Sequence, residues 1–328
     1  MSDVLDLAAF VGEQKVCTAL AWGWVDKGRV TSGSIGCDEH AIFDLASLTK
    51  PLATVTTVAF LLDDGALSLD QKIGFWLPEA GTQFANISIA DLLHHRAGLL
   101  AFSESLATGL QGAPETKLRA LRHRALEMPL RHRPGTVVYS DLGFILLAWI
   151  CQRAGRPVDA LRRHPGLGGF VVPPLDEGLE PLGFVATGRD ENGLPLLGRV
   201  HDPTCRLVGG INCGHAGWFG DLGSTLRASR AWLDLACGRA SALPAAARQL
   251  IEHAPGQRSA GFDIPTPGGT TGSNWGPRSF GHLGFTGTAM WVDPDADRCA
   301  VLLTNRTWPD GDDRGIGDLR RYFFSAVL

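Results

Sequence analysis

A serine and a lysine, Ser47 and Lys50, precede a long apolar run that ends at Leu62. Residues i and i+3 share one face of a helix, so a helix that starts near Ser47 would bring the hydroxyl and the amine together. A serine hydroxyl attacks a carbonyl only when a base takes its proton, and a desolvated lysine can act as that base. Unpaired N–H groups at the helix start would stabilise the negative charge that develops. The pair therefore predicts acyl-transfer chemistry.

Two features limit this interpretation. Ser-x-x-Lys occurs about once by chance in a chain of this length and composition, so a capping serine with a solvated lysine explains the pair alone equally well. Pro51 is compatible with a helix only in the first turn. We therefore predict that the first helical turn begins near Ser47.

Other polar residues are candidates of weaker specificity. Tyr139, one of two tyrosines, fits a core or interface ring with a solvated hydroxyl. His94 and His95 are adjacent and would point to different faces of a helix, which favours structural roles. The group His201, Cys205, Cys213 and His215 lacks the close ligand spacing of a structural zinc site. No metal and no cofactor is therefore predicted.

β-patterns occupy both ends of the chain. Residues 15–35 predict a hairpin that turns at 26–28, and residues 280–294 and 298–306 predict two further strands. Helices are predicted over 3–11, 47–62, 87–99, 115–128, 142–154, 221–237, 244–252 and 314–327. The 115–128 helix is rich in arginine, which indicates a solvated face, and 156–199 predicts an irregular connection.

This order of elements predicts an α/β (α+β) fold in which one antiparallel sheet is assembled from both chain termini and flanked by helices. The whole chain, 1–328, is expected to form a single domain with two lobes. The sheet-containing lobe would comprise about 1–60 and 255–328, and a mostly helical lobe about 61–254.

Composition excludes several classes of function. The chain has 328 residues, 45% of them hydrophobic, a net charge of −4 and a pI near 6.2. It therefore has no basic footprint for nucleic acid or an anionic membrane. Seven cysteines without regular spacing indicate reduced thiols. The first residues lack the pattern of a signal peptide, and the longest apolar stretch, 144–151, is too short for a membrane span. We expect a cytoplasmic protein.

Three stretches follow one another in the order of a known motif set: Ser47-x-x-Lys50, Tyr139-Ser140-Asp141 and His282-Leu283-Gly284. The set resembles that of the serine β-lactamases and penicillin-binding proteins, Ser-x-x-Lys, Tyr-x-Asn or Ser-x-Asn, and Lys-Thr-Gly. The similarity is strongest to the class C branch, which includes carboxylesterases, D-aminopeptidases and DD-peptidases. Residues 92–99, 209–219 and 281–288 also look like that branch, so the resemblance covers nearly the whole chain.

The resemblance implies a β-lactamase/transpeptidase-like fold and a role for each matching residue. Ser47 would be the acylated nucleophile, Lys50 its proton partner and Tyr139 the second proton-transfer group. The backbone N–H groups of Ser47 and Phe285 would form the oxyanion hole. The substrate side of the site would be lined by Asp141, His282, Leu283 and Gly284, with Gly284 allowing the substrate to lie close to the strand.

Three positions depart from the family pattern. Asp141 replaces an asparagine, and its charge would favour protonated Lys50 and weaken it as a base unless Tyr139 carries that role. His282 replaces a lysine and would bind a substrate carboxylate less strongly, and Leu283 removes a hydroxyl. An alternative register matches Ser140-Asp141-Leu142 to Ser-x-Asn and would make Ser140 the proton shuttle. The flanking sequence favours Tyr139.

The sequence thus predicts a serine hydrolase that cleaves a small-molecule ester or amide through an acyl-serine, with esterase-like or peptidase-like activity. One alternative is a true β-lactamase or DD-peptidase acting on a lactam or peptide. Another, motivated by Asp141 and Leu283, is a non-catalytic binding protein on the same fold. Neither the substrate nor the oligomeric state follows from the sequence.

Overall fold

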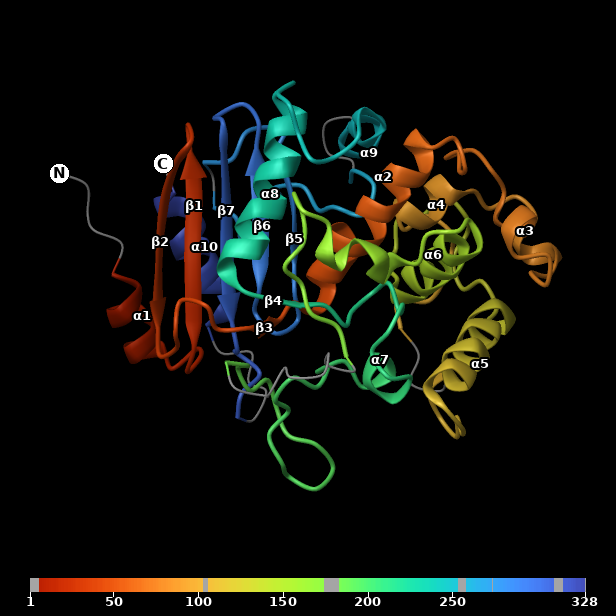
Figure 1. Ribbon diagram of the computed structural model, residues 1–328, viewed down its shortest axis with the longest axis horizontal. Helices are drawn as coiled ribbons and strands as arrows, with labels where there is room; N and C mark the ends of the chain where they lie inside the picture. Colours follow the sequence, from red (N-terminus) through yellow and green to blue (C-terminus); the bar gives the residue numbers. More distant parts are fainter. Residues whose placement is uncertain are drawn as a thin grey trace.

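The computed structural model describes residues 6–102, 106–173, 183–252, 258–272, 274–309 and 315–327. Its main sheet has five strands in the order β2-β1-β7-β6-β5, and all neighbouring strands are antiparallel (Figure 1). The strands are β1 (Leu20–Asp26), β2 (Arg29–Ile35), β5 (Phe280–Leu283), β6 (Ala289–Asp293) and β7 (Arg298–Thr304). Because β1 pairs with β7, the two ends of the chain meet in one sheet, as predicted.

The hairpin at the start of the chain lies where the sequence places it. Lys27 and Gly28 form its two-residue turn, and both have positive φ, 46° and 83°. Two central residues with positive φ match the twist of the flanking strands, and glycine adopts this conformation without steric cost.

The single strand expected over 280–294 is wrong. The chain turns back over residues 284–288, so that β5 and β6 pair with each other. Gly287 in this turn has φ +99°, which a residue with a side chain rarely adopts. As a result β5 is an edge strand of the sheet.

Helices cover both faces of the sheet. Helices α1 (Leu7–Gln14) and α10 (Ile316–Ala326) pack on one face through an apolar cluster that includes Leu20, Trp291 and Leu302. Helix α8 (Leu222–Ala236) packs on the opposite face, against β1, β6 and β7 (Figure 1). The division into two lobes stays a prediction.

The remaining helices gather beside the β5 edge (Figure 1). They are α2 (Thr56–Asp63), α3 (Ile73–Trp76), α4 (Ile89–Leu93), α5 (Pro114–Glu127), α6 (Asp141–Arg153), α7 (Pro203–Leu207) and α9 (Arg248–Ile251). Ten consecutive residues of α6, 142–151, are buried, so this helix forms the centre of the group. A short second sheet pairs β3 (Phe43–Asp44) with β4 (Phe219–Gly220).

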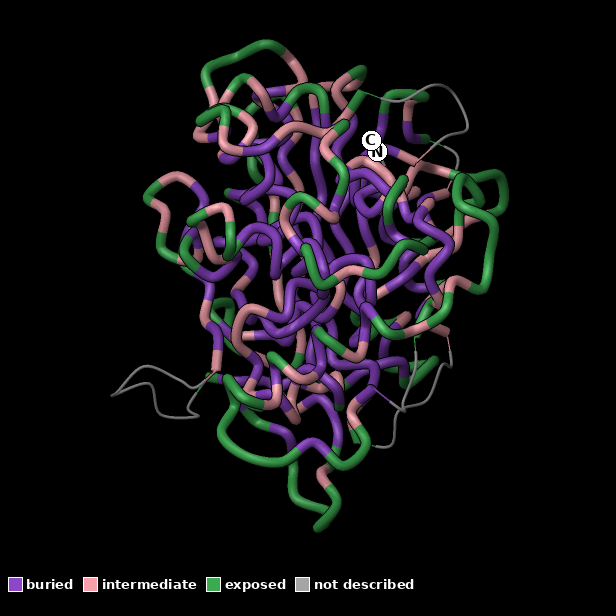
Figure 2. Tube along the Cα trace, turned by 90° about the vertical axis from the view of Figure 1, so that its right-hand side faces the viewer, coloured by how far each residue is buried: buried purple, intermediate pink, exposed green. Residues whose placement is uncertain are grey.

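Burial follows this arrangement. Buried residues run through the middle of the molecule and exposed residues lie at its periphery (Figure 2). Arg122 on α5 is an exception to the predicted solvated face, because it is 5% exposed and donates to Gln152 on α6 and to the Asn212 carbonyl. In the described part of the chain, no helix has both the length and the apolar character needed to cross a bilayer.

Candidate active site

Ser47 lies in a short 3-10 turn, Ala46–Leu48, that follows β3 and leads into a π-helical stretch, Lys50–Val55. The helical start near Ser47 is therefore confirmed, with Pro51 close to its beginning. Ala46 has φ +46°, a strained conformation for a residue with a Cβ. The Asp44 carboxylate holds this conformation by accepting the Ala46 N–H at 2.8 Å.

The β5–β6 turn fixes the same segment from the other side. Thr286 Oγ1 donates to the Asp44 carbonyl at 2.7 Å, and Thr288 Oγ1 donates to the Leu45 carbonyl at 3.1 Å. These bonds join residues about 240 positions apart in the chain. The Ser47 turn and the 284–288 turn therefore lie side by side.

Lys50 is fully buried, and its Nζ meets three groups. It lies 3.0 Å from Ser47 Oγ, 3.0 Å from the His215 carbonyl and 2.6 Å from Asp141 Oδ1. Burial by itself lowers the pKa of Lys50, but the negative charge of Asp141 outweighs burial, and the pKa of the amine is raised. Lys50 is thus charged at neutral pH.

Tyr139 lies against the same amine. Lys50 Nζ is 4.9 Å from the centre of its ring, and Lys50 and Ser47 are both close enough to lower the pKa of its phenol. Burial outweighs the charge of Lys50, so the pKa of the phenol is raised and the phenolate is its minor form at pH 7. The structure thus brings together Ser47, Lys50 and Tyr139.

His282, on β5, lies next to Tyr139. Its ring is buried and lies 5.9 Å from that of Tyr139. Burial lowers the pKa of His282 to about 4, so the imidazole is neutral at pH 7. Nδ1 lies 2.8 Å from the Leu283 carbonyl, which can only accept, so Nδ1 carries the proton. Phe285 follows in the turn, and among the described residues its N–H has no hydrogen-bond acceptor.

Comparison with known proteins agrees with this geometry. The Beta-lactamase family model matches residues 6–322. The chain belongs to the β-lactamase family. It is similar to a putative D-alanyl-D-alanine carboxypeptidase of Escherichia coli strain K12, at 29% identity over 90% of this chain and 77% of the relative. It is also similar to an N-acetylmuramyl-L-alanine amidase of Bacillus subtilis strain 168, at 28% identity over 81% of this chain and 68% of the relative.

Solved structures show the same fold. EstCE1, a hydrolase with promiscuous acyltransferase activity, superposes with a TM-score of 0.73 at 19% identity, covering 97% of this chain and 96% of that chain. A class C β-lactamase from Rhodobacter sphaeroides gives a TM-score of 0.70 at 18% identity with the same coverage. The predicted fold class and the family resemblance are confirmed.

The structure favours Tyr139 over Ser140 as the motif residue of this β-lactamase family member. Ser140 caps α6: its Oγ accepts from the Gly143 N–H and donates to the Leu100 carbonyl at 2.6 Å. The Ser140 N–H donates to His95 Nδ1. The Ser140 hydroxyl is therefore occupied by capping, whereas the Tyr139 ring faces Lys50.

Gly284 has a packing role in the turn after β5. A Cβ at this position would lie 1.9 Å from Thr288 Oγ1 and 2.8 Å from the Leu45 carbonyl. Such contacts are closer than packed atoms tolerate. The glycine therefore allows the β5–β6 turn to pack against the Ser47 segment.

The effect of the Asp141 charge on the pKa values of its neighbours in this site can be tested directly. This charge raises the pKa values of both Lys50 and Tyr139. Asp141→Asn should therefore lower both, and each unit lost by Tyr139 increases the phenolate fraction at pH 7 about tenfold. We expect acylation of Asp141→Asn by a p-nitrophenyl ester, measured in a single turnover, to be about tenfold faster than that of the wild type at pH 7. The rate should also begin to rise at a lower pH than in the wild type. An unchanged profile would contradict this role of the carboxylate.

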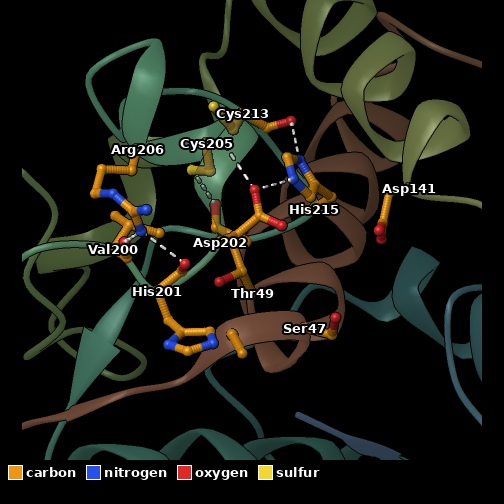
Figure 3. A network of polar contacts seen from close by, with 12 residues as sticks. Ser47, Thr49, Asp141, Val200, His201, Asp202, Cys205, Arg206, Cys213 and His215 are labelled. Atoms are coloured by element: carbon orange, nitrogen blue, oxygen red, sulfur yellow. Dashed lines mark hydrogen bonds and ion pairs between the residues drawn. The ribbon is translucent and has the colours of Figure 1, made fainter. Parts of the chain in front are cut away.

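The sequence analysis missed a buried ion pair behind Lys50. His215, whose carbonyl accepts from Lys50, is 1% exposed, and its Nε2 lies 3.2 Å from Asp202 Oδ1 (Figure 3). Burial lowers the pKa of His215, but the charge of Asp202 outweighs it and raises the pKa to about 9. Asp202 also caps α7 by accepting the Cys205 N–H at 2.7 Å. The Asp-Pro pair at 202–203 is a helix-start signal that could have indicated this cap.

Two further hydrogen bonds attach the segment that carries His215 to the helical stretch that follows Ser47. Thr54 Oγ1 donates to the Gly214 carbonyl at 2.7 Å, and the Trp218 N–H donates to Thr49 Oγ1 at 3.1 Å. In the part of the chain that the structure describes, no three His, Cys, Asp or Glu side chains are grouped as metal ligands would be. Of the residues considered as ligands from the sequence, His201 stacks on the ring of Phe285. Cys213 is a buried free thiol.

The His215–Asp202 pair predicts a pH-dependent stability. The folded pKa of His215, about 9, exceeds the unfolded value near 6.5, so its contribution is complete below pH 6.5 and is lost as pH rises through 9. At 1.36 kcal/mol per pKa unit this is about 3 kcal/mol. Urea unfolding should show that loss between pH 6 and pH 9.5 in the wild type. Asp202→Asn should be less stable at pH 6 and show a shallower decline, and an equal decline in both proteins would contradict this origin.

Proposed function

We propose that the protein is a serine hydrolase that cleaves an ester or amide through an acyl-serine intermediate, with esterase-like or peptidase-like activity. The observation that supports this most directly is the 3.0 Å contact between Ser47 Oγ and the buried amine of Lys50, with the Tyr139 ring centre 4.9 Å from that amine. A nucleophile, a proton acceptor and oxyanion donors within reach of one another are the elements that acyl transfer requires.

Tyr139 is the proposed base, because Lys50 is held in its charged form by Asp141. Ser47 Oγ would attack the carbonyl carbon while its proton passes to the Tyr139 phenolate, whose charge Lys50 stabilises. The oxyanion would accept from the N–H groups of Ser47 and Phe285. Tyr139 would then protonate the leaving group, and water would release the acyl group by the same path.

Its proposed partners are small-molecule esters, amides or lactams, which its family relatives make plausible. We also propose a cytoplasmic location. All seven cysteines are free, and five of them are buried, as expected where thiols stay reduced.

The decisive experiment is intact-mass detection of an acyl adduct after mixing with p-nitrophenyl esters, cephalosporins and D-amino-acid amides. An adduct that is absent from Ser47→Ala supports the proposal, and the productive substrate class separates esterase from peptidase activity. Rapid nitrocefin turnover would instead support a true β-lactamase. Absence of any adduct, including one with a fluorophosphonate probe, would favour a non-catalytic binding protein.

A further inference from the structure

The outer edge of β5 lies beside the Ser47 turn, and its backbone groups follow a simple alternation. Residues of an antiparallel strand direct both N–H and C=O to alternate sides. The Gly284 N–H donates to the Thr288 carbonyl, toward β6, whereas both backbone groups of Gly281 bond to Asp263 on the outer side. Leu283 therefore also faces outward, where an extended substrate would lie, and Phe285 follows it in the turn that begins at Gly284.

The carbonyls of both residues already accept a hydrogen bond from a side chain. The Leu283 carbonyl accepts from His282 Nδ1 at 2.8 Å, and the Phe285 carbonyl accepts from Arg306 Nε at 2.6 Å. Arg306 is 7% exposed, and its guanidinium lies 4.6 Å from the centre of the Phe285 ring. By contrast, the N–H groups of Leu283 and Phe285 have no acceptor among the hydrogen bonds of the described residues. The segment thus offers two free donors, whereas each of the two carbonyls already accepts one hydrogen bond and keeps a single lone pair for another.

A strand edge with free N–H groups and carbonyls that already accept hydrogen bonds should bind acyl groups without an N–H better than acyl groups with one. Peptide-like substrates pair with a strand edge through their own N–H groups as well as their carbonyls. An N–H group placed against an occupied carbonyl would lose its bond to water without full replacement, and an unsatisfied donor weakens binding substantially. An acyl group that carries only carbonyl oxygens and methylenes meets no such obstacle.

Apolar side chains lie along the edge, and the charged side chains of the adjoining cavity include Arg96, Glu252 and Arg258. The side chains of Phe285 and Val137 are 61% and 52% exposed, and Val137 and Leu283 line a cavity of about 700 Å³. His282 is neutral at pH 7 and adds no charge. Arg258, whose guanidinium lies 5.8 Å from the centre of the Tyr139 ring, forms an ion pair with Asp263.

We propose that the site selects esters whose acyl group has no N–H next to the scissile carbonyl, such as alkanoyl and oxoalkanoyl esters, over acylamino-acyl substrates. This specificity rests on the proposed acyl-serine function. Arg306 is its determining residue on the protein side, because it occupies the Phe285 carbonyl.

The test compares the p-nitrophenyl esters of 4-oxopentanoic acid and N-acetylglycine. Their acyl groups have the same length and the same second carbonyl, and they differ in a methylene against an N–H. Each kcat/KM is divided by the rate of hydrolysis by hydroxide, which removes the difference in intrinsic reactivity. The wild type should prefer the 4-oxopentanoate about tenfold, as expected for one unsatisfied donor. A normalised preference for the N-acetylglycine ester would overturn the inference.

A variant tests the assigned residue. Arg306→Met removes the donor to the Phe285 carbonyl and keeps a side chain over Phe285. It should reduce the preference for the 4-oxopentanoate from about tenfold to about twofold. Arg321→Met, which removes an exposed arginine paired with Asp318 on α10, should leave it unchanged. An equal preference in wild type and Arg306→Met would overturn the role of Arg306. If that variant does not fold, the ratio of the two normalised kcat/KM values in the wild type alone tests the proposed specificity. Failure of both esters to leave an acyl group on Ser47 by intact mass would overturn the proposed function itself.

Discussion

Replacing Lys50 with methionine should lower the rate of Ser47 acylation about 10³-fold, the middle of the range for losing a group in proton transfer. Lys50 Nζ contacts Ser47 Oγ at 3.0 Å, and its charge lowers the pKa of Tyr139. Without the amine, the phenolate would be rarer and the serine hydroxyl less firmly oriented. Stopped-flow release of p-nitrophenol in a single turnover measures this rate.

The same substitution should also destabilise the fold, because it leaves Asp141 without its cation. Breaking a buried ion pair by removing one partner costs about 3–5 kcal/mol, and we expect the lower end because the Asp141 side chain is 19% exposed. Lys50→Met/Asp141→Asn is the matched control: it should recover most of the free energy of unfolding in urea but not the rate. If Lys50→Met acylates at the wild-type rate, Lys50 has no part in the proton path.

Replacing Tyr139 with phenylalanine should reduce acylation by about 10²- to 10⁴-fold, the usual contribution of a positioned acid or base. The ring would keep its contacts with His95, at 4.7 Å between centres, and with Lys50, so the free energy of unfolding should change little. The measurement is the pre-steady-state burst of p-nitrophenol, together with its pH profile, whose alkaline rise should disappear.

Ser140→Ala is the control that separates the two registers of the motif. The Ser140 hydroxyl caps α6, so its removal should cost about 1 kcal/mol of stability and leave acylation within about twofold. The opposite result, with acylation lost in Ser140→Ala and retained in Tyr139→Phe, would transfer the proton shuttle to Ser140.

The substitutions of Lys50 and Tyr139 both remove a group that lies near Ser47. The sequence alone predicts the proximity of Lys50 to Ser47, but not that of Tyr139. Ser47 and Lys50 are one helical turn apart, and the contact between them follows from backbone geometry once the helix begins at the right residue. The capping box at Ser88 and Asp91 and the turn at Lys27 and Gly28 were similarly predictable, because each is completed within four residues.

The motif order also placed Tyr139 and His282 in one site, but only by resemblance to a family. Nothing in the residues around Tyr139 reveals that its ring would lie against Lys50. That contact depends on α6 and the nucleophile helix packing side by side, and such packing is a property of the whole core.

The sequence by itself determined most of the longer elements, the helical start near Ser47 and the candidate nucleophile, since local propensities and side-chain spacing decide those within a few residues. Only the tertiary structure decided that 280–294 folds into two strands, that Arg122 is buried, and that Asp202 pairs with His215 behind Lys50. It also decided that His282 and Arg306 occupy the carbonyls of the β5 edge. These features depend on burial and on partners far apart in the chain, and a polar group's partner and charge are set only when packing has removed water from around it.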